Sequence, residues 1–203
     1  GVARVVVGLG GSATNDAGLG LAAALGARLL DSRGRELEPG IGPAVNLNKI
    51  DLTDFSPLAR KARFFAVTDV RNPLLGKNGS APVYGPQKGA TAAQVREMEL
   101  ALKRVAAVME RDFGVSVGGV PGGGAAGGLA AGLMVFCGAE IVPGAEFVLN
   151  RLNAEERVRA ADIVVTGEGY LDQQTFFGKA PCAIAQLALK HKKPLLFVAG
   201  QRD

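Results

Sequence analysis

The sequence GEGYLDQQTFFGK at residues 167–179 separates two segments with contrasting patterns. The apolar run ADIVVT at residues 161–166 predicts a buried strand of a parallel sheet. Residues 180–190 predict a helix, with Pro181 in its first turn. The quoted stretch therefore connects a strand to a helix, which predicts an α/β fold whose loops gather at the carboxyl edge of the sheet.

Three ionisable side chains mark this connection. Glu168 follows the predicted strand, Asp172 lies four residues further on, and Lys179 stands where the helix begins. A pair of carboxylates can hold a metal ion, and a lysine beside free helix N–H groups suits an anion. Together they predict a site that handles the phosphates of a nucleotide.

The composition is that of a globular chain. Of 203 residues, 48% are hydrophobic and 21% are charged. The formal net charge is +4 and aromatic residues make up 5%, which predicts neither a strongly basic surface nor a platform for stacking bases. No signal peptide or uninterrupted transmembrane run is present. We therefore expect a cytoplasmic protein that binds neither nucleic acid nor a membrane.

A second polar loop follows a predicted strand at residues 4–7. The segment GLGGSATNDAGLG at residues 8–20 leads into a predicted helix that runs to about Leu30. Thr14 or Asn15 could cap this helix, and Ser12 adds a hydroxyl group. Free N–H groups, two hydroxyls and an amide then converge at a helix start, which predicts an anion site.

Two other interpretations of this loop stay open. Gly8, Gly10 and Ala13 match the loose dinucleotide-binding pattern, with Asp31 at about the expected distance, which would suit an NAD-dependent oxidoreductase. Alternatively, the loop is a tight turn in a non-catalytic structural domain.

A third loop follows the predicted strand at residues 64–68. Asp69 lies at the carboxyl end of that strand, and RNPLLGKNGSAPVYGPQKG at residues 71–89 is long for a connection, as functional loops often are. Asn72 offers a polar side chain there. Residues 91–113 predict the longest helix, capped by Thr91. The glycine-rich segment 114–132 permits either close approach to a ligand or close packing of a helix.

Four of these segments, in the same order, resemble the glycerate kinase family of the bacterial glycerate 2-kinase type. They are GLGGSATNDAGLG, TDVRNPLLGKNGSAPVYGPQKGAT, GGGAAGGLAAGL and GEGYLDQQTFFGKAP. The likeness extends over nearly the whole chain. The combination of GPQKG with a downstream GEG-x-x-D-x-Q-T-x-x-GK is its most specific part.

The resemblance implies a larger two-domain enzyme in which an α/β domain is inserted into a Rossmann-like one. Residues 1–160 would belong mostly to the inserted domain, with a mixed or parallel sheet and flanking helices, and residues 161–203 would return to the Rossmann-like domain. The family's N-terminal and C-terminal portions have no counterpart in this sequence. We therefore expect a partial chain that carries only part of the active site. A homodimer is one possible assembly.

The resemblance also implies the chemistry, which is transfer of the γ-phosphoryl group of ATP, with Mg²⁺, to a hydroxyl of D-glycerate. The 2-position is favoured by the subtype. Asp69 is our candidate for the base or a ligand of the substrate hydroxyl, although it could equally be a turn carboxylate. The other candidates are Glu168 and Asp172 for Mg²⁺ or the orienting network, Lys179 with Gln174 and Thr175 as a phosphate clamp, Ser12, Thr14 and Asn15 as a second anion cradle, and Asn72 for the substrate.

Overall fold

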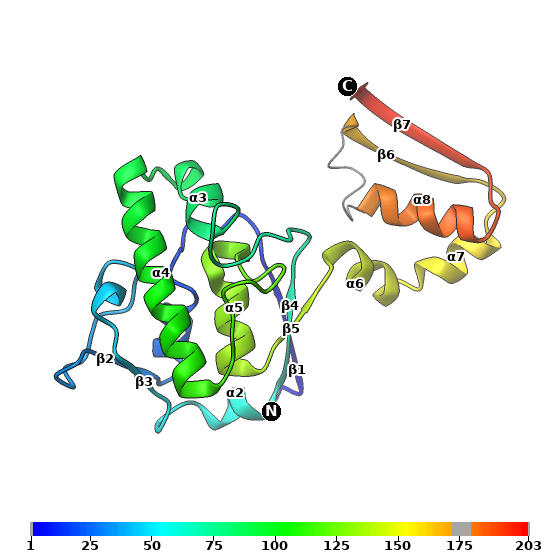
Figure 1. The fold of residues 1–203 in the computed structure, drawn as a ribbon. Coiled ribbons are helices and arrows are strands. Elements are labelled where there is room, and N and C mark those ends of the chain that lie inside the picture. Colours follow the sequence, from blue (N-terminus) through cyan, green and yellow to red (C-terminus); the bar gives the residue numbers. More distant parts are fainter. Residues whose placement is uncertain (1, 172–179, 203) are drawn as a thin grey trace. The chain divides into compact units, whose positions relative to one another are not determined.

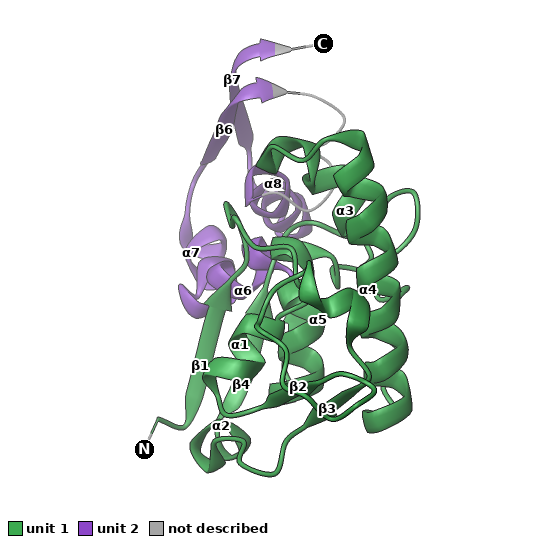
Figure 2. Ribbon diagram, turned by 90° about the vertical axis from the view of Figure 1, so that its left-hand side faces the viewer, with its two compact units in different colours: residues 1–141 green, residues 142–203 purple. Residues whose placement is uncertain are grey.

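The computed structural model describes residues 2–171 and 180–202. The chain divides into two compact units, Gly1–Ile141 and Val142–Asp203, which Figure 2 shows in different colours. None of the helices in the described part is both long and apolar enough to cross a membrane.

The first unit contains twelve of the described elements (Figure 1). In chain order they are β1 (Arg4–Gly8), α1 (Leu19–Ala24), β2 (Arg28–Leu30), the 3-10 helix η1 (Pro43–Asn46), β3 (Lys49–Asp51), α2 (Pro57–Lys61), β4 (Arg63–Val67), α3 (Ser80–Tyr84), the 3-10 helix η2 (Pro86–Lys88), α4 (Ala92–Phe113), α5 (Ala125–Cys137) and β5 (Glu140–Val142), which reaches the unit boundary.

The sheet of this unit contains a parallel pair of strands. The sheet has the order β1-β4-β5, and β1 pairs with β4 in parallel, from Arg4 opposite Arg63 to Gly8 opposite Val67. The two predicted strands are thereby confirmed. Figures 1 and 2 show α5 between the sheet and α4, so the core lies mainly between this sheet and the two helices. Because β1 and β4 run the same way, the loops that follow them leave the same edge of the sheet.

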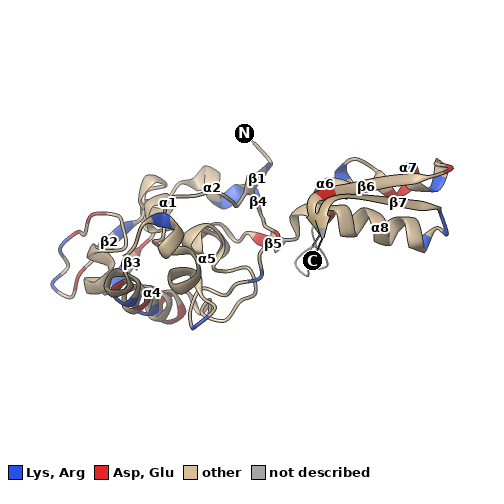
Figure 3. Cartoon of the chain, turned by 90° about the horizontal axis from the view of Figure 1, so that it is seen from above, with Lys and Arg blue, Asp and Glu red and all other residues tan. Residues whose placement is uncertain are grey.

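Helix α4 follows its prediction closely. Thr91 Oγ1 accepts a hydrogen bond from the Gln94 N–H (3.3 Å), and Gln94 Oε1 accepts one from the Thr91 N–H (2.8 Å), which forms a capping box. Leu102, Val105 and Met109 recur at helical spacing and are buried. Figure 3 shows both basic and acidic residues on this helix, so neither sign of charge dominates it.

The predicted helix from the glycine loop to Leu30 is wrong in its length. Helix α1 ends at Ala24, and residues Arg28–Leu30 form strand β2, which pairs with β3. Gly26 explains the break, because it adopts a left-handed conformation (φ 96°) against the backbone of Asp54. A left-handed glycine just past a helix is a common terminator, and a side chain there would overlap the Asp54 carbonyl.

The second unit is built around one parallel strand pair. Its elements are α6 (Gly144–Arg151), α7 (Ala154–Ala160), β6 (Val164–Leu171), α8 (Ala180–Lys190) and β7 (Leu195–Arg202). Strand β6 pairs with β7 in parallel, and α8 packs against β6 around the buried residues Val164 and Ala188. On the other side of these strands, Val165, Leu196 and Val198 are each more than half exposed.

Strand β6 is longer than the sequence predicts. The pattern placed its end at Thr166, but pairing continues to Leu171, opposite Arg202. Gly167 permits this, because a side chain at that position would overlap the backbone of Val198 on the neighbouring strand. Glu168 therefore lies within a strand, opposite Ala199, and not in a loop.

The glycine-rich entry to α5 packs backbone to backbone against the loop that follows β1. Ala126, Gly127 and Gly128 are all left-handed (φ 51°, 69° and 84°), and the Ala17 N–H donates to the Gly127 carbonyl (3.0 Å). Added Cβ atoms at Gly127 and Gly128 would overlap the backbone of Thr14 and Ala17. These two glycines therefore serve close packing, which the sequence had left open as one of two roles.

We predict that Gly127→Ala destabilises the protein strongly. The added methyl group would overlap the Thr14 carbonyl in a conformation that L-residues avoid, at a cost of at least about 2 kcal/mol. Urea denaturation measures this loss. Gly119→Ala is the matched control, because a Cβ atom there meets nothing within 4 Å. Equal unfolding free energies for the two variants would show that the contact does not hold α5 in place.

Candidate functional site

The loops after β1 and β4 meet at the carboxyl edge of the sheet. Lys88 Nζ donates to Ser12 Oγ (3.3 Å) and to the Thr14 carbonyl. Deeper in the unit, Ser80 Oγ donates to Asn15 Oδ1 (2.7 Å). The expectation that these two loops converge is therefore confirmed. The third predicted loop, after residue 166, belongs to the second unit.

Asp16 organises the glycine loop from inside. Its buried carboxylate accepts hydrogen bonds from Thr14 Oγ1 (2.9 Å), the Gly18 N–H (3.0 Å) and the Gly20 N–H (2.9 Å). The residue before α1 is Gly18, which has no side chain to cap the helix, and neither Thr14 nor Asn15 binds the N–H groups there, so the predicted cap by either residue is wrong. The physical reason is that Asp16 already occupies the N–H groups at the helix start.

A hollow of about 380 Å³ opens beside the loop. Among the residues that the structure describes, none accepts a hydrogen bond from the backbone N–H groups of Gly10, Gly11 and Ser12. Gly11 is left-handed (φ 61°), and successive N–H groups in such a turn suit an anion. The hollow is lined by Leu9, Gly10, Gly11, Ser12, Val70, Tyr84, Gln87, Lys88 and Ala126.

Lys88 brings a positive charge to this hollow. Burial lowers the pKa of its ammonium group below the usual value, and the nearby Asp16 carboxylate offsets part of that shift. A partly desolvated ammonium attracts an anion more strongly than one in open water. The sequence analysis did not predict a role for Lys88, which it included only in the motif GPQKG, and it proposed Lys179 as the phosphate-binding lysine. The position of Lys88 in a long loop that follows a strand could have indicated its role.

Tyr84 lies on another wall of the hollow and is oriented by Asn72. The Tyr84 hydroxyl donates to Asn72 Oδ1 (2.9 Å), and Asn72 Nδ2 donates to the Asn78 carbonyl (2.9 Å). Burial raises the pKa of Tyr84, so its hydroxyl stays protonated near neutral pH. The predicted residue Asn72 is thus brought to the site through Tyr84.

Some of the other predicted site residues lie at the hollow, and others lie away from it. Ser12 lines the hollow, Thr14 bonds to Asp16, and Asn15 is buried against Ser80 and the Met98 sulfur. Asp69 is exposed just after β4, where its neighbour Val70 lines the hollow.

Glu168 is half-buried on β6 in the second unit. Asp172, Gln174, Thr175 and Lys179 lie outside the described residues. Within the described ranges, no three His, Cys, Asp or Glu side chains cluster as metal ligands.

Comparison with known proteins identifies the chain's relatives. The model of the glycerate kinase family matches residues 1–203.

This chain belongs to the glycerate kinase family.

A glycerate kinase from Halalkalibacterium halodurans is 45% identical over 200 residues, which covers 98% of this chain and 53% of that protein. The glycerate 2-kinase of Escherichia coli K12 is 43% identical, with 98% and 52% covered. A solved structure described as glycerate kinase 2 from Salmonella typhimurium LT2 superposes with a TM-score of 0.87 at 42% identity, covering 98% of this chain and 54% of that one. The chain therefore spans about half the length of the glycerate kinases it matches.

We predict that anion binding in the hollow weakens at alkaline pH. The ammonium form of Lys88 provides the attraction, and its lowered pKa means that the charge is lost at a lower pH than for an ordinary lysine. Calorimetric titration with D-glycerate and, separately, with inorganic phosphate measures the change. Lys88→Arg keeps its charge at every practical pH and should remove this dependence. The same alkaline decline in the arginine variant would assign it to another group.

Proposed function

We propose that this chain contributes the hydroxyl-phosphorylating site of a glycerate kinase, which transfers the γ-phosphoryl group of ATP to D-glycerate. Membership of the glycerate kinase family over all 203 residues carries the proposal. The structural match to the Salmonella protein supports it. The 2-hydroxyl is the proposed acceptor, because the E. coli relative is named glycerate 2-kinase.

The described hollow supports this proposal because it offers positive charge and N–H groups. This reaction depends on positioning and on stabilising negative charge that spreads over the phosphoryl oxygens. The Lys88 ammonium and the N–H groups of Gly10, Gly11 and Ser12 offer that stabilisation around one hollow. The Tyr84 hydroxyl gives its hydrogen to Asn72, so its oxygen is left to accept a hydrogen bond, for example from a hydroxyl of the substrate. We propose that Lys88 and the three N–H groups bind an anionic part of the substrates, and that Asp69 orients the accepting hydroxyl from the same edge of the sheet.

Mg²⁺ is the metal that we propose for this reaction. Its usual protein ligands are one or two carboxylates, with phosphate oxygens and water completing the set. The half-buried carboxylate of Glu168 suits this chemistry, with Asp172 as the proposed second ligand and Lys179, Gln174 and Thr175 as the proposed phosphate clamp. When bound, the ion would neutralise charge on the phosphates.

The domain assignment stays our proposal, with residues 1–160 mostly in an inserted domain and residues 161–203 in a Rossmann-like one. The succession β6–α8–β7 supports it, because two parallel strands joined through a helix are the repeating unit of Rossmann-like sheets. A cytoplasmic location and a homodimeric assembly stay predictions of the same kind.

The oxidoreductase alternative finds no support at Asp31. Its carboxylate accepts hydrogen bonds from the N–H groups of Arg33 (2.8 Å) and Arg35 (2.9 Å) and from Arg35 Nε (2.8 Å). The hydrogen bond from the Arg35 N–H is the main cause of the lowered pKa of Asp31. The carboxylate therefore closes its own turn, whereas a dinucleotide site would need it for a ribose.

We predict that the full-length protein releases ADP from ATP–Mg²⁺ only when D-glycerate is present. Lys88→Met should lower kcat/KM by about 100-fold or more, because it removes a charge that stabilises the transferring group. Lys77→Met is the matched control, since Lys77 is an exposed lysine in the same loop. A coupled assay measures turnover, and ³¹P NMR of the product identifies the phosphorylated hydroxyl.

Two results would contradict these expectations. A wild-type protein that makes no ADP with D-glycerate would refute the proposed reaction. Equal losses in the Lys88 and Lys77 variants would refute the role given to Lys88.

A further inference from the structure

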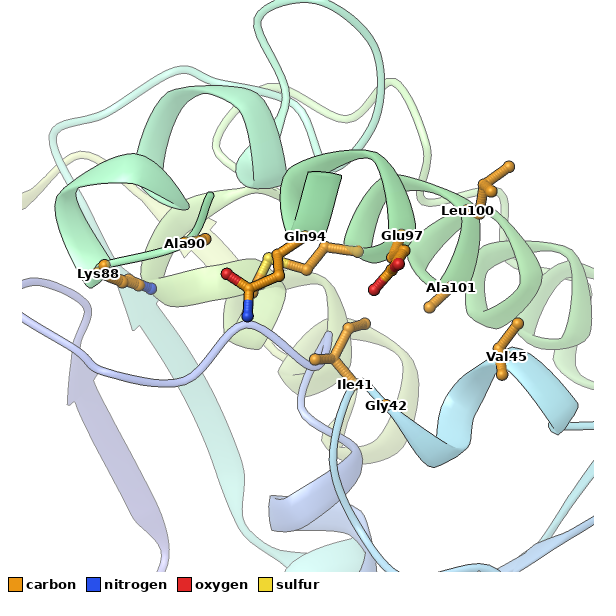
Figure 4. Close-up of a pocket in the computed structure, with 11 residues that line it drawn as sticks. Ile41, Gly42, Val45, Lys88, Ala90, Gln94, Glu97, Leu100 and Ala101 are labelled. Atoms are coloured by element: carbon orange, nitrogen blue, oxygen red, sulfur yellow. The ribbon is translucent and has the colours of Figure 1, made fainter. Parts of the chain in front are cut away.

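A second and larger hollow lies on the other side of Lys88. It has a volume of about 580 Å³ and runs between the first half of α4 and the segment at residues 41–45. Figure 4 shows Lys88 at one end of this hollow and Leu100 and Val45 at the other. Lys88 is the residue that lines both hollows.

The walls of this hollow are mostly apolar. Ile41, Val45 and Met98 contribute aliphatic and thioether groups from its two sides. Gln94 and Glu97 add an amide and a carboxylate, and Figure 4 shows both directed into the space between α4 and Ile41. The capping bond from the Thr91 N–H to Gln94 Oε1 (2.8 Å) fixes that amide. Apolar walls with a few oriented polar groups, at this volume, are typical of sites for organic ligands.

The two hollows share the ammonium group of Lys88 but differ in the other groups that line them. The smaller hollow presents glycine N–H groups and a serine hydroxyl, which suit phosphate oxygens. The larger one presents apolar walls, which suit a flat heterocycle. D-glycerate is small and polar throughout, so it would leave those walls largely without contact. A nucleoside triphosphate has both an apolar ring system and an anionic chain.

We propose that the larger hollow binds the nucleoside of ATP, with Lys88 at the junction where its phosphates pass toward the glycine loop. This inference rests on the proposed kinase function and assigns the donor side of the site. In this arrangement Gln94 and Glu97 face polar edges of the nucleoside, while Ile41 and Met98 contact its ring system.

Gly42→Leu tests this assignment by filling the hollow from its wall. Gly42 has a right-handed conformation (φ −61°, ψ −59°), and outside its two chain neighbours a Cβ atom there meets nothing within 4 Å. Because Pro43 follows and its ring crowds any Cβ atom at the preceding position, Gly42→Ala is included as the control for that backbone effect. In the full-length enzyme we expect the KM for ATP to rise about tenfold, while the KM for D-glycerate changes by less than about twofold. Gly119→Leu is the matched control, because its Cβ atom also has open space but lies outside both hollows.

Binding of adenosine separates the nucleoside contact from the phosphate contact. In calorimetric titration the wild type should bind adenosine, and Lys88→Met should weaken the binding of adenosine far less than that of ADP, since adenosine has no phosphate. Gly42→Leu should abolish this binding. ADP should bind more weakly to both variants, because it uses both parts of the site.

Several outcomes would overturn the inference. A rise in the KM for D-glycerate alone would make the hollow an acceptor site, and unchanged KM values would leave the nucleotide elsewhere. If Gly42→Leu changes the molar mass measured by light scattering, relative to the wild type, but not the KM for ATP, a second copy of the chain covers this surface. If the wild type shows no kinase activity, the proposed function fails by itself, and the adenosine titration still decides whether this hollow binds a nucleoside.

Discussion

The site depends on the contact between the start of α5 and the backbone of residues 14–17. Gly127 and Gly128 have no side chains, so the two backbones approach closely enough for the Ala17 N–H to reach the Gly127 carbonyl. That contact fixes the loop after β1 against the helix that covers the sheet. It also places Ala126 in the wall of the smaller hollow. The rest of the loop, and the lysine that bonds to it, take their positions from this arrangement.

Two sets of N–H groups in the same loop have different tasks. Those of Gly18 and Gly20 bind Asp16, which acts as a built-in anion. Those of Gly10, Gly11 and Ser12 have no acceptor among the described residues, and these three residues line the hollow beside Lys88. A carboxylate inside the loop therefore shapes it, while a cation at its edge keeps the hollow attractive to anions. The same Asp16 charge supports the protonated state of Lys88, which burial alone would weaken further.

Features that depend on neighbouring residues were predictable from the sequence. The apolar runs of β1 and β4, the helical spacing in α4 and the capping signal at Thr91 are local patterns, and each was confirmed. The four ordered motifs were sufficient to indicate the family. The end of α1 and the length of β6 were not predictable, because Gly26 and Gly167 act through backbones distant in sequence, those of Asp54 and Val198.

The candidate site was predictable only in part. The sequence indicated that the loops after β1 and β4 would converge, and Ser12 and Asn72 are indeed at or beside the hollow. It did not show that Asp16 would take up the N–H groups at the helix start, or that Lys88 would reach back to Ser12 and Thr14. Those facts depend on side-chain directions in the folded chain, which spacing along the sequence does not specify.

The carboxylate of Asp16 also has a consequence for the kinetics of association. A binding loop that is disordered before its ligand arrives loses conformational entropy on binding, which weakens binding and can slow capture. Here the hydrogen bonds from Thr14, Gly18 and Gly20 to Asp16 hold the loop in shape with no ligand present. We therefore expect encounter and docking, more than loop ordering, to set the speed at which an anion is captured at this hollow.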